Sequence, residues 1–380
     1  MIERKRPKKL TDSEAMAMAI EEAKKGLGHV APNPPVGCVI LDREGRLLSK
    51  GFHQRFGGSH AEIEALKGIS ADSVEGASVF VTLEPCSHFG KTPPCADKLI
   101  TLALRRVVFG VVDPNPEVSG RGAERIANAN IPISEYEDEN GANLKGDLED
   151  LIEVFSMNQR LKAPFVSLKV ASSLDGQMAL KSGESQWITN EASRHHAHFL
   201  RATHDAVIIG SRTVEIDDPK LNIRRSDFAD RTNKVVVMDP AGSLFKKRKD
   251  LALYKVRDPK EIFFVVSDKM PATNSDEVNI IRLAEEEPGQ FDLKELLKVL
   301  FSTGVKSLLL EGGSHLYGSF LKQRLVHRIF YYQAPILLGS TNGLSWSSGI
   351  RVGRMSERIS LKRVKIDLFG DDILVSGRID

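Results

Sequence analysis

The chain has 380 residues, of which 41% are hydrophobic and 27% are charged, a balance that is ordinary for folded globular protein and excludes a disordered one. Its formal net charge of +2 gives no global sign of a protein that binds nucleic acid or an anionic membrane. No apolar run is long enough to cross a bilayer, and the charged N-terminus lacks the apolar core of a secretory signal. We therefore expect a cytoplasmic protein of two domains, whose three cysteines serve a metal instead of disulfides.

The first predicted element is a helix that begins at a capping box. Thr11 is the expected N-cap, and Glu14 reaches back to it, ahead of an apolar-periodic stretch. The proline-rich run at 32–35 cannot be helical, and it leads into an apolar strand over 36–41. A short turn then connects to a second predicted strand over 46–52.

The next stretch carries three candidate metal ligands. His60 lies in the first turn of a predicted helix, Cys86 follows a predicted strand over 78–83, and Cys95 begins the next helix. One imidazole and two thiols are ligands that zinc prefers, and three protein ligands leave the fourth tetrahedral position free, as in catalytic sites. Glu62 lies close enough in sequence to relay a proton there. Zinc-dependent base deaminases show this pattern.

The alternative at this point is a structural zinc site, or three core residues with no connection to one another. Such sites close with a fourth Cys or His, usually through short paired spacings, whereas eight residues separate Cys86 from Cys95. The third cysteine, Cys38, lies in an apolar run and is expected to be a core residue. His53 or His88 could still close a structural site, so this alternative stays open.

The rest of the first half predicts one more strand and a helix before a domain boundary. The strand covers 106–112. Gly120-Arg121-Gly122 is not a dinucleotide-binding fingerprint, because Arg125 stands where the third glycine belongs. A helix is expected through about Met157, and we place the boundary where 162–164 breaks it.

The second half alternates strands and helices, which predicts an α/β domain with a largely parallel sheet. Apolar strands are expected at 165–170, 206–209, 234–238, 262–266, 307–310 and 328–333. One predicted helix carries His195, His196 and His198. The spacing of His195 and His198 would suit a metal, but we expect these histidines to face solvent.

Two glycines follow the predicted strand at 307–310. Glu311-Gly312-Gly313 precedes a predicted helix, and backbone amides at such a helix start can hold a phosphate that glycines allow to approach closely. Glycines in this place often serve only the turn, so the motif alone favours neither role.

Several motifs together closely resemble the family of bifunctional riboflavin-biosynthesis deaminase-reductases. Those in the first half are His60-Ala61-Glu62, Thr82-Leu83-Glu84-Pro85-Cys86-Ser87-His88, Gly90-Lys91-Thr92-Pro93-Pro94-Cys95 and Asp113-Pro114-Asn115-Pro116. Those in the second half are Ser172-Ser173-Leu174-Asp175-Gly176, Gly183-Glu184-Ser185-Gln186-Trp187-Ile188-Thr189, Asp217-Asp218-Pro219 and Glu311-Gly312-Gly313. The resemblance covers nearly the whole chain and includes the long gap between Cys86 and Cys95.

The resemblance implies an α/β protein of two parts. Residues 1–155 would form a cytidine-deaminase-like three-layer domain, and residues 162–380 a dihydrofolate-reductase-like domain. The first would hydrolyse the ring amine of 2,5-diamino-6-(ribosylamino)-pyrimidinone 5'-phosphate with one zinc ion per chain. The second would reduce the ribosyl chain of the product to ribityl with NADPH.

The resemblance also assigns site residues. His60, Cys86 and Cys95 would hold zinc, and Glu62 would relay the proton. The residues that would contact the deaminase substrate are Asn33, His53, His88, Lys91 and Asn115. Those that would contact the reductase substrate are Lys169, Ser185, Arg201, Leu221, Arg224 and Glu311. Those that would bind NADPH are Ala171, Trp187, Thr213, Asp217, Gly313, Ser314, His315, Leu316, Tyr317, Gly318 and Ser319.

Two other functions are weighed against this one. A nucleoside or tRNA deaminase would share the zinc site but would leave the second half unexplained. A non-catalytic zinc-binding interaction protein would have no need of Glu62. We expect a small phosphorylated pyrimidine as the partner, with no nucleic acid and no membrane, and a homo-oligomer is left open.

Overall fold

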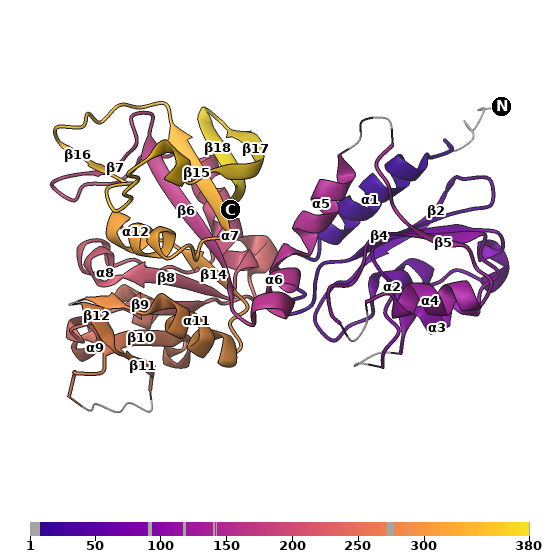
Figure 1. Cartoon of the computed structure of the whole chain (residues 1–380), viewed down its shortest axis with the longest axis horizontal. Coiled ribbons are helices and arrows are strands. Elements are labelled where there is room, and N and C mark those ends of the chain that lie inside the picture. Colours follow the sequence, from indigo (N-terminus) through magenta and orange to yellow (C-terminus); the bar gives the residue numbers. More distant parts are fainter. Residues whose placement is uncertain are drawn as a thin grey trace. The chain divides into compact units, whose positions relative to one another are not determined.

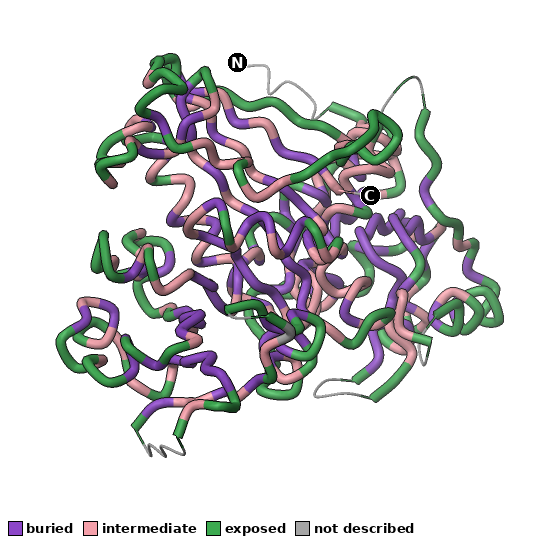
Figure 2. The backbone as a smooth tube through the Cα atoms, turned by 60° about the vertical axis from the view of Figure 1, so that its left-hand side comes forward, coloured by how far each residue is buried: buried purple, intermediate pink, exposed green. Residues whose placement is uncertain are grey.

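The structure is a computed structural model that describes residues 8–89, 93–116, 119–139, 141, 143–271, 277–287 and 289–379. The chain divides into two compact units, Met1–Leu161 and Lys162–Asp380, each with its own sheet (Figure 1). Buried residues are concentrated in the central strands, and exposed residues lie on many of the loops (Figure 2). Among the described residues, no helix is both long and apolar enough to cross a membrane.

The first unit is built on a five-stranded sheet in the order β2-β1-β3-β4-β5. Its strands are β1 (Gly37–Leu41), β2 (Leu47–Phe52), β3 (Ser78–Leu83), β4 (Arg106–Val111) and β5 (Ile133–Glu135). Strand β1 pairs antiparallel with β2 and β3, whereas β3, β4 and β5 run parallel. The carboxyl ends of β3 and β4 therefore lie at the same edge of the sheet.

Helices cover both faces of this sheet, which makes a three-layer unit. The helices are α1 (Asp12–Lys24), α2 (Ala61–Leu66), α3 (Cys95–Ile100), α4 (Arg121–Asn128), α5 (Leu144–Leu151) and α6 (Glu153–Leu161), with a 3-10 turn at Ala71–Val74. Met16 of α1 and Leu148 of α5 pack with Phe80 on one face. Leu99 of α3 and Ile126 of α4 pack on the other. Apolar burial on both faces fixes the sheet between the helices.

Local sequence signals explain the helix starts in this unit. The capping box is present: Thr11 accepts from the backbone N–H of Glu14, and Glu14 accepts from that of Thr11. His60 is the N-cap of α2, one position before the first turn in which we expected it. The predicted single helix to Met157 is two helices that break at Ile152. The break lies at Ile152, whose φ of −104° and ψ of 7° are outside the α-helical range.

The second unit contains a nine-stranded sheet in the order β11-β10-β9-β8-β14-β6-β15-β18-β17. The strands of this unit are β6 (Phe165–Ser173), β7 (Gln177–Leu180), β8 (Ala206–Gly210), β9 (Lys234–Met238), β10 (Ile262–Ser267), β11 (Asn279–Leu283), β12 (Glu285–Glu287), β13 (Gln290–Phe291), β14 (Ser307–Leu310), β15 (Arg328–Ala334), β16 (Gly343–Ser345), β17 (Leu361–Phe369) and β18 (Asp372–Ile379). The pairs from β11 to β15 are parallel, as predicted. Strands β18 and β17 add an antiparallel edge that the sequence did not reveal.

Helices pack against this sheet and form two apolar cores with it. The helices are α7 (Glu191–Thr203), α8 (Ser211–Asp217), α9 (Ser243–Lys246), α10 (Ala252–Lys255), α11 (Leu293–Ser302) and α12 (Ser314–Lys322), with 3-10 turns at Ser226–Phe228, Arg248–Asp250, Pro259–Glu261 and Met355–Glu357. Leu296 of α11 and Phe320 of α12 belong to one core. Leu200 of α7 and Val214 of α8 belong to the other. The loops after β8 and β14 emerge at the carboxyl ends of parallel strands, where α/β sheets place their ligands.

Candidate active sites

Three side chains of the first unit converge as a candidate metal centre. The Nδ1 atom of His60 lies 3.5 Å from Sγ of Cys86 and 3.3 Å from Sγ of Cys95. All three donor atoms lie within 4.8 Å of one another. Within the described residues this group contains neither His53 nor His88, the two histidines that could have closed a structural site.

The donor set fits zinc in both chemistry and spacing. One imidazole nitrogen and two thiolates are borderline-soft ligands of the kind that zinc prefers. Bonds of about 2.3 Å to sulfur and about 2.1 Å to nitrogen, at the tetrahedral angle, would set a nitrogen and a sulfur about 3.6 Å apart. The separations from His60 Nδ1 to the two sulfurs agree with that value.

The fold brings these ligands together from three elements. His60 is the N-cap of α2, Cys86 follows β3, and Cys95 is the first residue of α3. The backbone N–H of Cys95 donates to Sγ of Cys86 at 3.3 Å, which fixes the second ligand against the third. Cys38 is fully buried in an apolar core, as expected.

Glu62 shares a cavity of about 280 Å³ with the metal ligands His60 and Cys86. Only 4% of the surface of Glu62 is exposed, and burial raises the pKa of its carboxyl above the ordinary value. A carboxyl in this place can hold a proton near the metal centre without being needed as a ligand.

Four of the five residues expected to contact the deaminase substrate line this same cavity, namely Asn33, His53, His88 and Asn115. Asn33 Nδ2 lies 3.1 Å from His53 Nε2, and the Nδ1–H of His53 donates to the carbonyl of Ser59 at 2.9 Å. The ring of His53 is thereby fixed edge-on to that of His60. Lys91 lies outside the described residues.

Glu84 and Phe155 are among the residues of this cavity that the sequence reasoning did not assign to the site. Glu84 is 3% exposed, and its carboxylate accepts from backbone N–H groups at the start of α4. Two sequence features were available as signals for Glu84. One is its acidic side chain two positions before Cys86, and the other is the glycine-rich start of α4 further along the chain. Phe155 lies on α6, and no sequence signal connected it to this cavity.

A second cavity, of about 1060 Å³, lies in the second unit. It is lined by all six residues expected to contact the reductase substrate: Lys169, Ser185, Arg201, Leu221, Arg224 and Glu311. It is also lined by ten of the eleven expected cofactor residues: Ala171, Trp187, Thr213, Asp217, Gly313, Ser314, His315, Leu316, Tyr317 and Ser319. The remaining one, Gly318, packs on Gly349 instead, where an added Cβ would lie 2.6 Å from the Gly349 Cα.

A buried ion cluster forms the wall of this second cavity. Arg201 donates to Glu311 through Nε at 2.7 Å and through Nη2 at 3.0 Å, and Lys169 Nζ lies 3.1 Å from the same carboxylate. Burial alone would raise the pKa of Glu311, but the two cations hold that pKa below its ordinary value. The carboxylate is therefore kept ionised, with two positive charges beside it.

The loop after β14 forms another part of the wall. Gly312 has a φ of +140°, a backbone conformation that favours glycine because glycine has no Cβ. Its N–H donates to the Tyr317 hydroxyl at 3.1 Å. Gly313 is the N-cap of α12, and its helix start faces the cavity. Gly313, Ser314 and His315 at this helix start line the cavity, where the sequence suggested a phosphate loop.

The expectation that the three histidines of α7 face solvent holds for His195 only. His195 is exposed, His196 is half-buried, and His198 is 8% exposed and lines the second cavity. The expectation fails because it considered α7 alone, whereas the segment that carries Asn222 packs over the helix and covers His198.

Comparison with known proteins identifies the families that the two halves of the chain resemble. Residues 9–111 match the family model of the cytidine and deoxycytidylate deaminase zinc-binding region, and residues 164–375 match that of the RibD C-terminal domain. The riboflavin biosynthesis protein RibD of Actinobacillus pleuropneumoniae is 35% identical, with 97% of this chain and 95% of that protein covered. RibD of Escherichia coli strain K12 is 34% identical, with 96% and 98% covered.

Solved structures give the same result. A diaminohydroxyphosphoribosylaminopyrimidine deaminase/5-amino-6-(5-phosphoribosylamino)uracil reductase of Thermotoga maritima is similar with a TM-score of 0.81 at 34% identity, covering 97% of this chain and 98% of that one. Acinetobacter baumannii RibD is similar with a TM-score of 0.79 at 32% identity, covering 97% and 99%.

The fold and the sites define a zinc-binding, cytidine-deaminase-like domain followed by a reductase domain of dihydrofolate-reductase-like fold, as expected. Together they imply zinc and a nicotinamide cofactor. The chain belongs to the riboflavin biosynthesis protein RibD family, and it is a bifunctional deaminase and reductase of riboflavin biosynthesis. A nucleoside or tRNA deaminase with an unrelated second domain, and a non-catalytic zinc protein, are not favoured by these matches.

Proposed function

We propose that residues 1–155 hydrolyse the ring amine of 2,5-diamino-6-(ribosylamino)-pyrimidinone 5'-phosphate to an oxo group, and that residues 162–380 reduce the ribosyl chain of the product to ribityl. The first reaction would use one zinc ion per chain and release ammonia, and the second would use NADPH. The observation that carries the proposal is the convergence of His60, Cys86 and Cys95, two of which share a cavity with the buried Glu62.

In the deaminase site, His60, Cys86 and Cys95 hold the metal. Bound zinc supplies Lewis acidity that activates water at neutral pH. Glu62 accepts the proton of the attacking water and returns it to the departing ammonia, as a positioned general acid–base. The substrate is held by the residues that line the cavity, Asn33, His53, His88 and Asn115, and by Lys91.

In the reductase site, one cavity is lined by the proposed substrate residues and by all of the proposed cofactor residues except Gly318. NADPH supplies the hydride, and the chain orients it against the substrate. Opening of the ribosyl ring would turn the ring oxygen into a hydroxyl and leave a C=N bond between the sugar C1' and the amino nitrogen. A hydride from NADPH would then add to C1' and a proton to the nitrogen, which gives the ribitylamino chain and NADP⁺. The carboxylates that line this cavity are Asp217, Asp292 and Glu311. The lysines and arginines that line it, among them Lys169, Arg201 and Arg224, outnumber these carboxylates and favour a phosphorylated ligand.

The proposal is tested by incubating the purified full chain with the diamino pyrimidinone phosphate and NADPH. Ammonia should appear first, and NADPH absorbance should fall only as deaminated product accumulates. Supplying the deaminated product directly should start NADPH oxidation at once, and NADH should serve less well. Ammonia release without any later oxidation, or oxidation of NADPH by the undeaminated substrate alone, would contradict the proposed order of reactions.

A further inference from the structure

We propose that His198 is a positioning residue, whose neutral ring aims the guanidinium of Arg224 at the phosphate of the reductase substrate. This inference rests on the proposed reductase function and deepens it. His198 is 8% exposed, lines the second cavity, and is not among the residues that the sequence indicated for substrate or cofactor.

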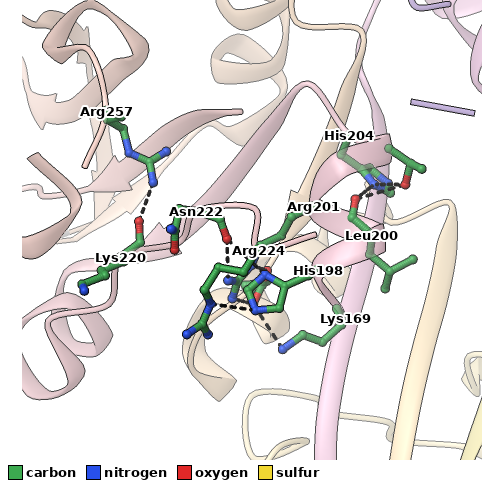
Figure 3. A network of polar contacts seen from close by, with 12 residues as sticks. Lys169, His198, Leu200, Arg201, His204, Lys220, Asn222, Arg224 and Arg257 are labelled. Atoms are coloured by element: carbon green, nitrogen blue, oxygen red, sulfur yellow. Dashed lines mark hydrogen bonds and ion pairs between the residues drawn. The ribbon is translucent and has the colours of Figure 1, made fainter. Parts of the chain in front are cut away.

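Each ring nitrogen of His198 has a hydrogen-bond partner, and the two partners together determine which nitrogen carries the proton. Nδ1 lies 3.1 Å from the backbone carbonyl oxygen of Asn222. Because a carbonyl oxygen only accepts, Nδ1 must carry the hydrogen. Nε2 is then the acceptor, and it takes the Nε–H of Arg224 at 3.1 Å. Figure 3 shows His198 between these two partners.

A proton on Nε2 would break this arrangement, because it would set an N–H of His198 against the N–H of Arg224. Arg201 also lies nearby, with Nη1 at 3.4 Å from the same Asn222 carbonyl. In agreement, burial and the charges of Arg201 and Arg224 lower the pKa of His198 to about 4. The ring is therefore an uncharged acceptor at neutral pH.

The two arginines of the cavity differ in what they can still bind. Arg201 uses Nε and Nη2 on Glu311 and Nη1 on the Asn222 carbonyl, so its guanidinium is already occupied. Arg224 is exposed in the cavity and uses only Nε, on His198; its two terminal nitrogens have no partner among the described residues. A pair of N–H donors on a fixed plane is the arrangement that grips phosphate oxygens.

The segment that carries Asn222 and Arg224 is itself anchored. Arg257 donates to the backbone carbonyl of Lys220 (Figure 3). Through Nη1 it also donates to the backbone carbonyl of Asn233 at 2.9 Å. His198 thus connects a fixed segment to a guanidinium whose two terminal nitrogens have no partner among the described residues. Its removal should leave Arg224 in place but unaligned.

Matched substitutions of His198 test its hydrogen bond to the Asn222 carbonyl separately from its hydrogen bond with Arg224. His198→Asn keeps a donor near the Nδ1 position but removes the acceptor for Arg224, whereas His198→Gln places an amide oxygen near the Nε2 position. His195→Ala is the control, because His195 lies on the same helix and is exposed. Arg224→Ala and the double variant His198→Asn/Arg224→Ala complete the set.

The first readout is binding of ribose 5-phosphate and of ribose, by calorimetry, to each full-length variant. Arg224→Ala should weaken ribose 5-phosphate binding by about 10- to 100-fold, the scale of a lost charge-assisted pair. His198→Asn should weaken it about tenfold, His198→Gln should restore most of that loss, and His195→Ala should match the parent protein. Ribose binding should not change in any of them.

The second readout is NADPH oxidation with the deaminated product, where KM should rise in His198→Asn with little change in kcat. The double variant should be no worse than Arg224→Ala, since His198 acts through Arg224. The inference would be overturned if the loss in the double variant equalled the product of the two single losses. It would also be overturned if binding of ribose and of ribose 5-phosphate were weakened equally. Failure of the parent protein to oxidise NADPH would instead contradict the proposed function, because phosphate binding is measured without turnover.

Discussion

The carboxylate of Glu84 accepts the backbone N–H of Gly122 at 3.0 Å. The same carboxylate accepts from Asp113 at 3.2 Å and from Gly120 at 2.9 Å, so the segment before Cys86 is tied to the loop after β4 and to the start of α4. An added Cβ at Gly122 would lie 1.8 Å from the carbonyl oxygen of Pro85, so only glycine fits this approach. The glycines at 120 and 122 thus serve a buried carboxylate, not a nucleotide.

Glu84→Gln should destabilise the first unit and slow ammonia release. The amide nitrogen would face backbone N–H donors, and leaving them unpaired in a buried site costs about 1–3 kcal/mol each. Denaturant unfolding and ammonia assays would measure this, with Glu124→Gln on exposed α4 surface as the control. NADPH oxidation with the deaminated product should be unchanged. Equal loss of both activities would show that Glu84 does not act through the deaminase site alone.

Glu62→Ala should separate metal binding from proton transfer. Because the proposed ligands are His60, Cys86 and Cys95, this variant should keep about one zinc per chain while the deaminase rate falls on the order of 100-fold or more. Cys86→Ser should lose metal as well as activity. Elemental analysis and ammonia release measure the two effects. A metal-free Glu62→Ala beside a zinc-loaded Cys86→Ser would reverse the assigned roles.

Gly313→Val should weaken NADPH binding by about tenfold or more without affecting the fold. An added Cβ would meet Thr213 Oγ1 at 3.6 Å, an ordinary contact, so the side chain fits but occupies cavity space that a phosphate would need. Gly313→Ala should have a smaller effect. Titration of NADPH measures affinity, and ammonia release should be unchanged. Unaltered NADPH binding in the valine variant would exclude the phosphate-loop role.

The two activities should separate when the chain is divided between residues 161 and 162. Each unit has its own sheet and apolar cores, and each is of normal domain size. Residues 1–161 should release ammonia without NADPH, and residues 162–380 should oxidise NADPH only with the deaminated product. A fragment that ends at residue 150 should be less active, because it lacks Phe155 of the deaminase cavity. Circular dichroism and zinc content must first show that each piece is folded.

His198 should make the second unit less stable in acid. Its folded pKa is about 4 against an ordinary 6.5, so the unfolded state takes up the proton first. The contribution of neutral His198 to the free energy of unfolding is complete above about pH 6.5 and is lost as the pH falls toward 4. At about 1.4 kcal/mol per pKa unit, that loss is roughly 3 kcal/mol. Urea unfolding of His198→Gln should show a shallower decline over that window than the parent protein. His195→Ala should decline as steeply as the parent.

Sequence alone determined the features that depend on neighbours along the chain. The capping box at Thr11 and Glu14 formed as predicted, because its two bonds join residues within one helical turn. Strand β3 was predicted with its exact bounds from its apolar run. The three zinc donors could be named because their types and order restrict the chemistry, even though their convergence had yet to be seen.

Tertiary structure decided the features that depend on segments far apart in the chain. His198 was misjudged because its partners lie 24 and 26 residues away, and no helical pattern reveals what packs over a helix. Glu84 meets the N–H of Gly122 across 38 residues, and β15 pairs with β18 across a long connection. Burial and hydrogen bonding of this kind are set by how layers pack, which gives a side chain its protonation state and direction only once the chain is folded.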